Sequence, residues 1–398
     1  MCYTVNMINK AYQYRIYPNK NQQELLEKHF GCVRFVYNYG LSKKIEAYQK
    51  DKKRLSCFDL INELAELKKE KEFEWLKEVN SQSLQMSLRN LDNAFTKFFR
   101  EKKGFPNFKS KKKNINSFQV PQHLKLTDKL SLPKIPDIKI KQHRKLEGKI
   151  KTATVSKNPT GKYYVSILTE QIGDFPKKPK ISDKTTIGID LGIKTFATFS
   201  DGRKIENPRC LKNSLKKLKK QQKRLSRKVK GSNNRKKQIH KVALIHEKIK
   251  YQRSDFLHKI THQLTHDKQV KSIAVEDLNV KGMMKNRCLA QAISDVSWGE
   301  FRKQLEYKTD WYGRNLLVIG RFEASSKTCS CGVVNQKLKL SDREWTCEKC
   351  GKTHDRDVLA SQNIKNFALI PQGLRESTPL ERTAVAGSLK EEATRSLA

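Results

Sequence analysis

The sequence has no long hydrophobic run. Nowhere in its 398 residues do apolar side chains approach the roughly 18 consecutive positions that a membrane-spanning helix needs. The N-terminal stretch MCYTVNMINKAYQYRIYP also lacks the apolar core of a secretory signal peptide. We therefore expect a chain that neither spans a membrane nor is secreted, and that acts in the cytoplasm.

Acidic residues are scarce beside basic ones. The chain has 41 Asp and Glu against 83 Lys and Arg, which gives a formal net charge of +42. Such a charge repels itself, so we expect a large polyanion as partner, nucleic acid rather than a membrane surface. The hydrophobic fraction of 36% is low for one compact globule, and the length allows two or three domains.

Cysteine is too unevenly distributed to indicate a disulfide framework. The chain has nine cysteines, an odd number, and four of them cluster as C-x-C and, after fifteen further residues, C-x-x-C. Four thiolates at this spacing favour a closed tetrahedral Zn²⁺ site, although the first pair is one residue shorter than usual. A redox pair is the weaker alternative, because all four cysteines share one short module. The predicted zinc ligands are Cys329, Cys331, Cys347 and Cys350.

One acid lies at the end of a short apolar strand. In TTIGIDLGIKTFATFS (residues 185–200), Asp190 follows the apolar positions and a second β-prone run leads to an Asp201–Gly202 turn. Asp–Gly between two such runs is typical of a β-hairpin. A carboxylate in apolar surroundings is costly to bury unless a metal or another cation compensates it. A turn-capping Asp is the alternative interpretation.

Other acids lie at comparable places farther along the chain. Glu276 ends a second apolar strand, KSIAVEDL (residues 271–278), and THDRDVLASQNIKNFAL provides Asp355 and Asp357 at the start of a helix. Carboxylate oxygens are the ligands that Mg²⁺ prefers. Two such ions about 4 Å apart can activate water and stabilise the leaving oxygen of a phosphodiester. With Asp190, these acids predict a sheet-based magnesium site of the kind found in RNase H-like nucleases.

The N-terminal part alternates between strand and helix patterns. Residues 11–18 form a predicted strand, and Asn21 is the predicted N-cap of the first helix, which is either one long helix or two joined near Gly31. Two more helices are predicted up to residue 100, and strands return from 118 to 172, with a clear hairpin at 149–170. We expect these strands to pair with the first one, so that the helices are an insertion into a small barrel. The apolar stripe of the third helix is predicted to be ordinary core packing; it comprises Leu84, Leu88, Leu91, Phe95 and Phe98.

Two segments combine strong positive charge with features that suit nucleic acid. The loop 101–114 places Phe105 and Phe108 among lysines that include Lys109, and aromatic rings between cations suit bases and phosphates. Residues 207–267 read as a basic αα-hairpin, which favours a polyanion contact over a merely solvated face. Its candidate contacts are Lys216, Lys217, Lys219 and Lys220.

The order of the motifs resembles the TnpB family of RNA-guided nucleases, which bacterial and archaeal insertion sequences carry and which are relatives of the type V CRISPR effectors. The motifs are, in order, IGIDLGIKTFAT, IAVEDL, SDVSWGEFRKQLEYKTDWYG, SSKTCSCG, REWTCEKCG and HDRDVLASQNI. The resemblance spans nearly the whole chain. It departs from the family pattern at the short first cysteine pair and at Leu359, where Asn is usual.

The resemblance implies a multidomain α+β fold. An RNase H-like (RuvC) nuclease domain would comprise residues 183–322 and 352–370, with a zinc ribbon inserted at 323–351. A small β-barrel wedge domain would comprise 1–20 and 118–182, with a helical recognition domain inserted at 21–117. The C-terminal tail, 371–398, is expected to be disordered.

The resemblance also implies an activity. Asp190, Glu276 and Asp357 would be the catalytic acids, holding two Mg²⁺ ions, and one Zn²⁺ would be structural. A monomer would bind a guide RNA from its own element's end and cut double-stranded DNA beside a short motif, which Gln85 would help to read. A non-catalytic nucleic-acid-binding accessory of transposition is the rival, disfavoured by the intact acids. A self-sufficient transposase is a third possibility, weakened because nothing identifies end-specific binding.

Overall fold

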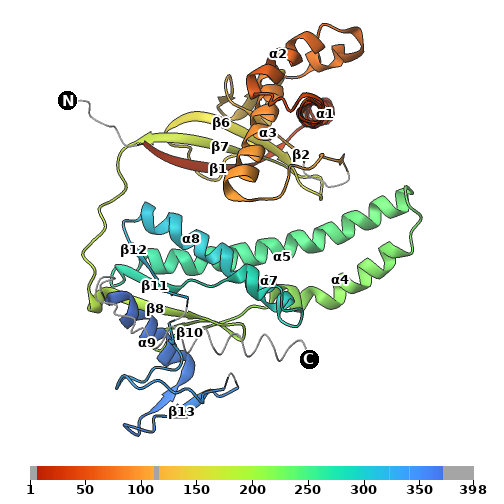
Figure 1. The fold of residues 1–398 in the computed structure, drawn as a ribbon. Helices are drawn as coiled ribbons and strands as arrows, with labels where there is room; N and C mark the ends of the chain where they lie inside the picture. The colour runs from red at the N-terminus through yellow and green to blue at the C-terminus, as the bar shows by residue number, and fades with distance from the viewer. Residues whose placement is uncertain (1–6, 112–115, 322, 340, 371–398) are drawn as a thin grey trace, which may run out of the picture. The chain divides into compact units, whose positions relative to one another are not determined.

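The computed structural model describes residues 7–111, 116–321, 323–339 and 341–370 (Figure 1). The tail for which disorder is expected lies outside these residues. The chain divides into two compact units, Met1–Asp174 and Phe175–Ala398, and each is described by itself. Among the described residues, no helix is both long enough and apolar enough to cross a membrane.

An antiparallel sheet forms the base of the first unit. Its seven strands are arranged in the order β2-β6-β7-β1-β5-β4-β3. The first strand pairs with the last along nearly its whole length, from Met7 opposite Ile172 to Ile16 opposite Tyr163, which confirms the predicted pairing. In the described part of the chain the sheet ends at β2 and β3, so the expected barrel is an open sheet. The strands are β1 (Met7–Tyr17), β2 (Asn116–Val120), β3 (Lys125–Leu126), β4 (Lys129–Leu132), β5 (Ile135–Lys141), β6 (Lys149–Lys157) and β7 (Tyr163–Ile172).

Within the described residues of this unit, the helices lie between β1 and β2 in the sequence. They are α1 (Lys20–Asp51), α2 (Cys57–Leu67), the 3-10 helix η1 (Lys71–Glu78) and α3 (Ser81–Glu101). The N-cap of α1 is Asn19, two residues before the predicted Asn21, and Asn19 forms a capping box with Gln22. The helix continues through Gly31. This region therefore forms one long helix, not two helices joined near Gly31.

Close helix packing explains why α1 tolerates a second glycine, Gly40. A Cβ at this position would lie only 2.7 Å from Leu88 and 3.1 Å from Leu91, both on α3. The predicted stripe of α3 is therefore core at its N-terminal end, where Leu84, Leu88 and Leu91 are buried. Towards its C-terminal end the stripe is less buried: Phe95 is partly buried and packs against this core, whereas Phe98 is partly exposed and lies outside it.

The second unit contains a five-stranded mixed sheet, in the order β10-β9-β8-β11-β12. Its strands are β8 (Thr186–Leu191), β9 (Thr195–Phe199), β10 (Lys204–Glu206), β11 (Ser272–Glu276) and β12 (Asn315–Ile319). The first three form the predicted antiparallel meander, and β11 runs parallel to β8 with Val275 opposite Ile189. Asp190 and Glu276 each follow one of these paired residues, so the strand pairing places both acids at the same level of adjacent strands.

Two long helices and several shorter ones accompany this sheet. They are α4 (Cys210–Ser226), α5 (Asn233–His266), α6 (Val280–Met283), α7 (Ala290–Val296), α8 (Trp298–Trp311) and α9 (Arg356–Leu369), and a small ribbon pairs β13 (Glu344–Thr346) with β14 (Thr353–Asp355). The apolar periodicity of residues 295–312 predicts one amphipathic helix, but the structure divides this region at Ser297, whose φ of 60° is left-handed. Ser297 is at once the C-cap of α7 and the N-cap of α8.

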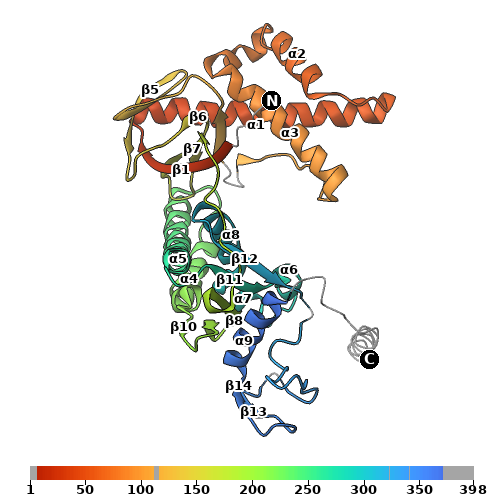
Figure 2. The same cartoon turned by 90° about the vertical axis from the view of Figure 1, so that its left-hand side faces the viewer.

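Helix α9 packs directly on β8 because β8 has no side chain at Gly188. A Cβ there would overlap the carbonyl oxygen of Ser361 and lie 2.8 Å from the backbone nitrogen of Lys365, both on α9. Figure 2 shows α9 beside β8. This approach brings the first turn of α9, with Asp357, to the strand that carries Asp190.

We predict that Gly188→Ala destabilises the second unit by about 1–3 kcal/mol, because the added methyl group must displace backbone rather than a flexible side chain. Thermal unfolding of the purified protein, followed by circular dichroism, measures the change. The control is Gly299→Ala on α8, where a Cβ has open space and Ala is the better helix former. An unchanged melting temperature for Gly188→Ala would contradict the prediction.

Candidate nuclease centre and zinc cluster

Asp190 lies near the end of β8 in an unfavourable electrostatic environment. Burial, together with the negative charges of Glu276 and Asp357, raises the pKa of its carboxyl to about 7, although Arg356 opposes the shift. Glu276 and Asp357 are therefore both close enough to Asp190 for their charges to act on it. A cluster of carboxylates without compensating charge destabilises a folded chain, and a bound cation would remove that cost.

Glu276 ends β11 and is held by the segment that leads to the cysteine cluster. Its Oε1 accepts a 2.6 Å hydrogen bond from the hydroxyl of Ser325. Burial raises the pKa of Glu276, and the bond from Ser325 partly opposes this. The backbone carbonyl of Ser325 in turn accepts a 2.7 Å bond from Asn363 on α9. Ser325 and Asn363 thus connect Glu276 to α9, although no sequence pattern indicated a role for either residue.

Asp355 and Asp357 are two residues apart but have different roles in the structure. Asp355 is the N-cap of α9, where its side chain accepts from the backbone N–H groups of Asp357 and Val358. It also pairs with Lys204 at 2.7 Å. Burial raises the pKa of Asp355, but Lys204 and the two N–H groups outweigh it, so the net shift is downward. Asp355 is thus satisfied as a helix cap.

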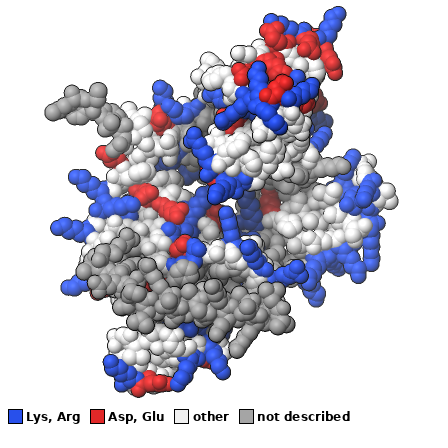
Figure 3. Space-filling view, viewed as in Figure 1, with Lys and Arg blue, Asp and Glu red and all other residues white. Residues whose placement is uncertain are grey.

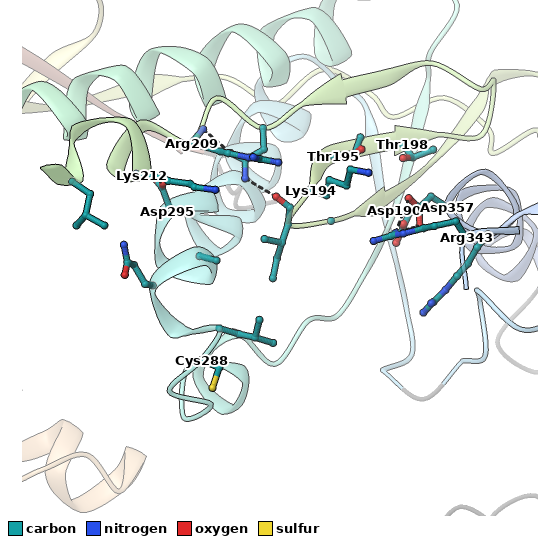
Figure 4. Close-up of a pocket in the computed structure, with 18 residues that line it drawn as sticks. Asp190, Lys194, Thr195, Thr198, Arg209, Lys212, Cys288, Asp295, Arg343 and Asp357 are labelled. Atoms are coloured by element: carbon teal, nitrogen blue, oxygen red, sulfur yellow. Dashed lines mark hydrogen bonds and ion pairs between the residues drawn. The ribbon is translucent and has the colours of Figure 1, made fainter. Parts of the chain in front are cut away.

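Asp357 instead belongs to the acid cluster. Its charge acts on Asp190, and both of its carboxylate oxygens lie 3.4 Å from Arg343 Nη1. In Figure 4 the side chains of Asp190 and Asp357 lie next to each other, with Arg343 beside them. The geometry favours Asp357 over Asp355 as the third acid.

A cleft of about 780 Å³ opens at these acids and is rich in cations. Asp190 and Asp357 line it, whereas Glu276 lines a smaller neighbouring cleft. Sequence patterns identified the acids but none of the surrounding basic side chains, because these come from separate loops and helix starts. They are Lys194, Arg209, Lys212, Arg343 and Arg356. Carboxylates at the base of a cationic cleft can bind divalent metal and hold a phosphodiester above it.

The cysteine cluster meets the geometry of a metal site. The four thiol sulfurs of Cys329, Cys331, Cys347 and Cys350 all lie within 4.8 Å of one another, and no other group among the described residues meets this spacing. A tetrahedral Zn²⁺ with Zn–S bonds of about 2.3 Å separates its sulfurs by about 3.8 Å, close to the 3.5 Å between Cys329 and Cys350 and the 3.7 Å between Cys331 and Cys347. The short first pair therefore does not prevent the four thiols from converging.

A histidine that no sequence motif indicated lies against this cluster. His354 on β14 is buried, and its Nε2 lies 3.1 Å from the sulfur of Cys329. Its ring also packs against Trp345, with 5.1 Å between ring centroids. An imidazole N–H that donates to a thiolate stabilises the charged form of the ligand, as partners of metal ligands do elsewhere.

We predict that the purified chain holds one Zn²⁺ and that Cys347→Ser loses it. Because zinc binding contributes directly to the folding free energy of such a module, the variant should also lose protease resistance around residues 323–357. Elemental analysis and limited proteolysis measure the two effects. Exposed Cys288 lies outside the cluster, so Cys288→Ser is the matched control. Zinc-free wild-type protein, freshly purified without chelator, would contradict the assignment.

The predicted lysine contacts lie together on one helix. Lys216, Lys217, Lys219 and Lys220 are all exposed on α4, and Figure 3 shows basic side chains gathered over the α4–α5 hairpin. Buried Asp295 fixes the start of α4 by accepting from the backbone N–H groups of Leu211 and Lys212 and by pairing with Arg253 at 3.1 Å. The lysines are therefore presented on an anchored scaffold.

The other two predicted contacts lie in the first unit. Gln85 is half-buried on α3. Lys109 is exposed to solvent, but the ammonium group at the end of its side chain lies 3.8 Å from the centre of the Tyr37 ring. Burial of this ammonium lowers the pKa of Lys109. The backbone of Lys109 also exchanges two hydrogen bonds with the side chain of Asn38, so the lysine is tied to α1.

Comparison with protein-family models gives matches along most of the chain. Residues 164–287 match OrfB_IS605, described as "Probable transposase", and residues 298–364 match the Cas12f1-like TNB domain. Residues 7–53 match a model described as a helix-turn-helix domain. In this structure they form β1 and the single continuous helix α1.

Full-length relatives are also found. A protein of Streptomyces pristinaespiralis is 40% identical over 99% of this chain and 98% of its own length. One from Escherichia coli K12 is 34% identical over 89% of this chain and 91% of its own length. Both carry the name "Putative RNA-guided DNA endonuclease", with InsQ appended for the second. Among solved structures, a Cas12f1–sgRNA–target DNA complex has a chain of similar fold, with a TM-score of 0.57 at 14% identity, covering 90% of this chain and 99% of that one.

Proposed function

The chain belongs to the TnpB family, and from this membership together with its cluster of acids we propose that it is an RNA-guided DNA endonuclease. It would bind a guide RNA from the end of its own element and cut double-stranded DNA beside a short motif. The observation that carries the proposal is the convergence of three acids from distant parts of the sequence, Asp190, Glu276 and Asp357, around one buried position. Sequencing of RNA that co-purifies with the protein tests the guide.

The acids would hold the metal, and the basic side chains would hold the DNA. The ligand atoms would be the carboxylate oxygens of Asp190, Glu276 and Asp357, and oxygen ligands suit Mg²⁺ ions, of which we propose two. When bound, such ions supply an activated water and stabilise the leaving oxygen of the phosphodiester. Lys194 and Arg209 line the same cleft and would orient the backbone of the strand by charge. Arg343, which pairs with Asp357, would neutralise part of the negative charge at the phosphate.

We propose a separate role for each part of the two units. We assign the sheet at 1–20 and 118–182 to a wedge domain and the helices at 21–117 to target recognition. Residues 183–322 and 352–370 would form a RuvC-like nuclease domain, and 323–351 a zinc ribbon. Support comes from the structure: in the described part of the first unit the helices lie between two strands of one sheet, and Asp190, Glu276 and Asp357 lie in the second unit.

We predict that Asp190→Ala abolishes cleavage of both DNA strands, while guide RNA and target binding stay near wild type. Asp190→Asn should fail almost as badly, because it keeps the shape of the side chain but loses the charge that binds metal. Plasmid cleavage in Mg²⁺ measures the effect, and each variant is first checked for RNA binding.

The matched pair is Asp357→Ala and Asp355→Ala. We expect the first to be inactive and the second to retain cleavage with a helix cap weakened by about 1 kcal/mol. Cleavage by Asp190→Ala would refute the nuclease assignment. Loss of cleavage in Asp355→Ala with retention in Asp357→Ala would refute only the choice of third acid.

We predict that substitutions of the α4 lysines and of Gln85 change different properties of nucleic-acid binding. A variant with Gln in place of four lysines should bind nucleic acid more weakly and with less salt dependence; the four are Lys216, Lys217, Lys219 and Lys220. Its preferred motif should not change, because phosphate contacts carry no sequence information. Gln85→Ala should change the preferred motif, because Gln can bridge the edge of an adenine, and leave the salt dependence intact. Salt-titrated binding and cleavage of a library with randomised flanks measure the two quantities.

Each of these variants is the control for the other, since one changes charge and the other does not. An unchanged salt dependence would show that the lysines form only a solvated surface. An unchanged preferred motif in Gln85→Ala would show that Gln85 does not help to recognise the target motif.

We propose Lys109, whose ammonium lies on the ring of Tyr37, as a further contact to the phosphate backbone of the nucleic acid. The salt titration should therefore include Lys109→Gln.

A further inference from the structure

A second large cleft lies wholly within the first unit. It has a volume of about 720 Å³ and is formed by the C-terminal part of α1, the segment that follows it, the C-terminal part of α3 and Phe105. Cavities of this size accommodate small organic groups. All of its lining residues belong to one compact unit.

Aromatic rings line this cleft and remain open to solvent. Phe105 packs edge-on against Phe95 and Phe98, with ring centroids 5.5 and 5.4 Å apart. Phe99 lies 5.0 Å from Phe98, yet 63% of its surface is exposed, as is 60% of Tyr48. Phe99 lies outside the predicted apolar stripe of α3, and within that stripe Phe95 and Phe98 are only partly buried. Such a concentration of exposed rings indicates a binding surface.

Cations surround these rings. The ammonium of Lys52 lies 5.1 Å from the ring centre of Tyr48, and the guanidinium of Arg54 lies 5.9 Å from that of Phe99. Lys53 and Arg100 also line the cleft. Its one acid, Asp92, is already paired with Lys44 at 3.1 Å. Within the described residues the cleft therefore has a clear excess of positive charge, and it is complementary to an anion that carries a flat apolar group.

We propose that this cleft binds an unpaired nucleotide of RNA, with the base stacked on Tyr48 or Phe99 and the phosphates held by Lys52, Arg54 and Arg100. A nucleotide combines a flat π-face with a negative charge, which is the combination that the cleft matches. Folded RNA presents unpaired bases in loops and ends, whereas duplex DNA must first be unstacked. RNA is therefore the occupant that binds without this cost.

This inference rests on the proposed RNA binding and adds a site to it. It also gives the loop containing Phe105 a role, since that loop completes the cleft wall. Stacking of one base on one aromatic ring changes affinity by about 5- to 150-fold on alanine substitution, so a double substitution should be readily measured.

The test uses the full-length chain and an unstructured RNA of about ten nucleotides, a length within the usual site size for single strands, with one central 2-aminopurine. The fluorescence of this base is quenched when it stacks. We compare wild type, the Tyr48→Ala/Phe99→Ala double variant and Phe99→Trp. The control is Phe58→Ala, because Phe58 is 72% exposed in the same unit but lies outside the cleft. Binding is measured at high salt, which weakens the phosphate contacts elsewhere on the chain.

We expect the double variant to lose the quenching and to bind about 10-fold or more weakly, with Phe99→Trp and Phe58→Ala close to wild type. Circular dichroism checks that each variant is folded. Unchanged quenching in the double variant would overturn the proposal, as would a Phe99→Trp variant as defective as the double alanine. Equal binding of a DNA duplex of the same sequence would overturn the assignment to RNA.

Two further outcomes concern self-association of the chain and a complete absence of RNA binding. If the wild type self-associates in sedimentation and the double variant does not, the cleft is an interface between copies of the chain and the proposal is wrong. If the wild type binds no RNA at all, the proposed function fails together with this site. RNA binding that the double variant leaves intact would refute the cleft alone.

Discussion

The backbone contact between α9 and β8 at Gly188 is the constraint on which the candidate nuclease centre depends. Asp190 and Glu276 are brought together by strand pairing, which needs only backbone hydrogen bonds. Asp357 lies on a helix 167 residues away from Asp190 in the sequence, and only close packing of that helix on the sheet can bring it there. Because β8 has no side chain at Gly188, the backbone of α9 can approach at Ser361 and Lys365.

The assembled centre is costly to the fold, and its surroundings reduce the cost. Burial and like charges raise the pKa of Asp190 to about 7, which means that the folded chain resists ionisation of this group. Arg343 beside Asp357 and Ser325 beside Glu276 supply partial compensation. A carboxyl whose pKa is raised by burial and neighbouring negative charges is typical of functional sites. The cysteine cluster and α9 are linked to it through Ser325 and Asn363.

The sequence predicts those features that depend on local pattern. The strand ending at Asp190, its hairpin, the αα-hairpin and the Cys cluster all follow from periodicity, turn residues and ligand spacing. Features that depend on tertiary contacts do not. The ion pair between Asp355 and Lys204 joins residues 151 positions apart in the sequence, and the helix breaks at Ser297, which is neither proline nor glycine. The exposure of Phe99 depends on which neighbouring segments pack against α3.

Asp190, Glu276 and Asp357 are proposed to form one divalent-metal centre, and binding of Mn²⁺ tests this central claim without relying on cleavage. Electron paramagnetic resonance on the full-length zinc-loaded protein counts the bound Mn²⁺ at increasing metal concentration. We expect specific Mn²⁺ binding by wild type that is retained in Asp355→Ala and lost in Asp190→Ala. Equal Mn²⁺ binding by wild type and Asp190→Ala, or none by wild type, would contradict the claim.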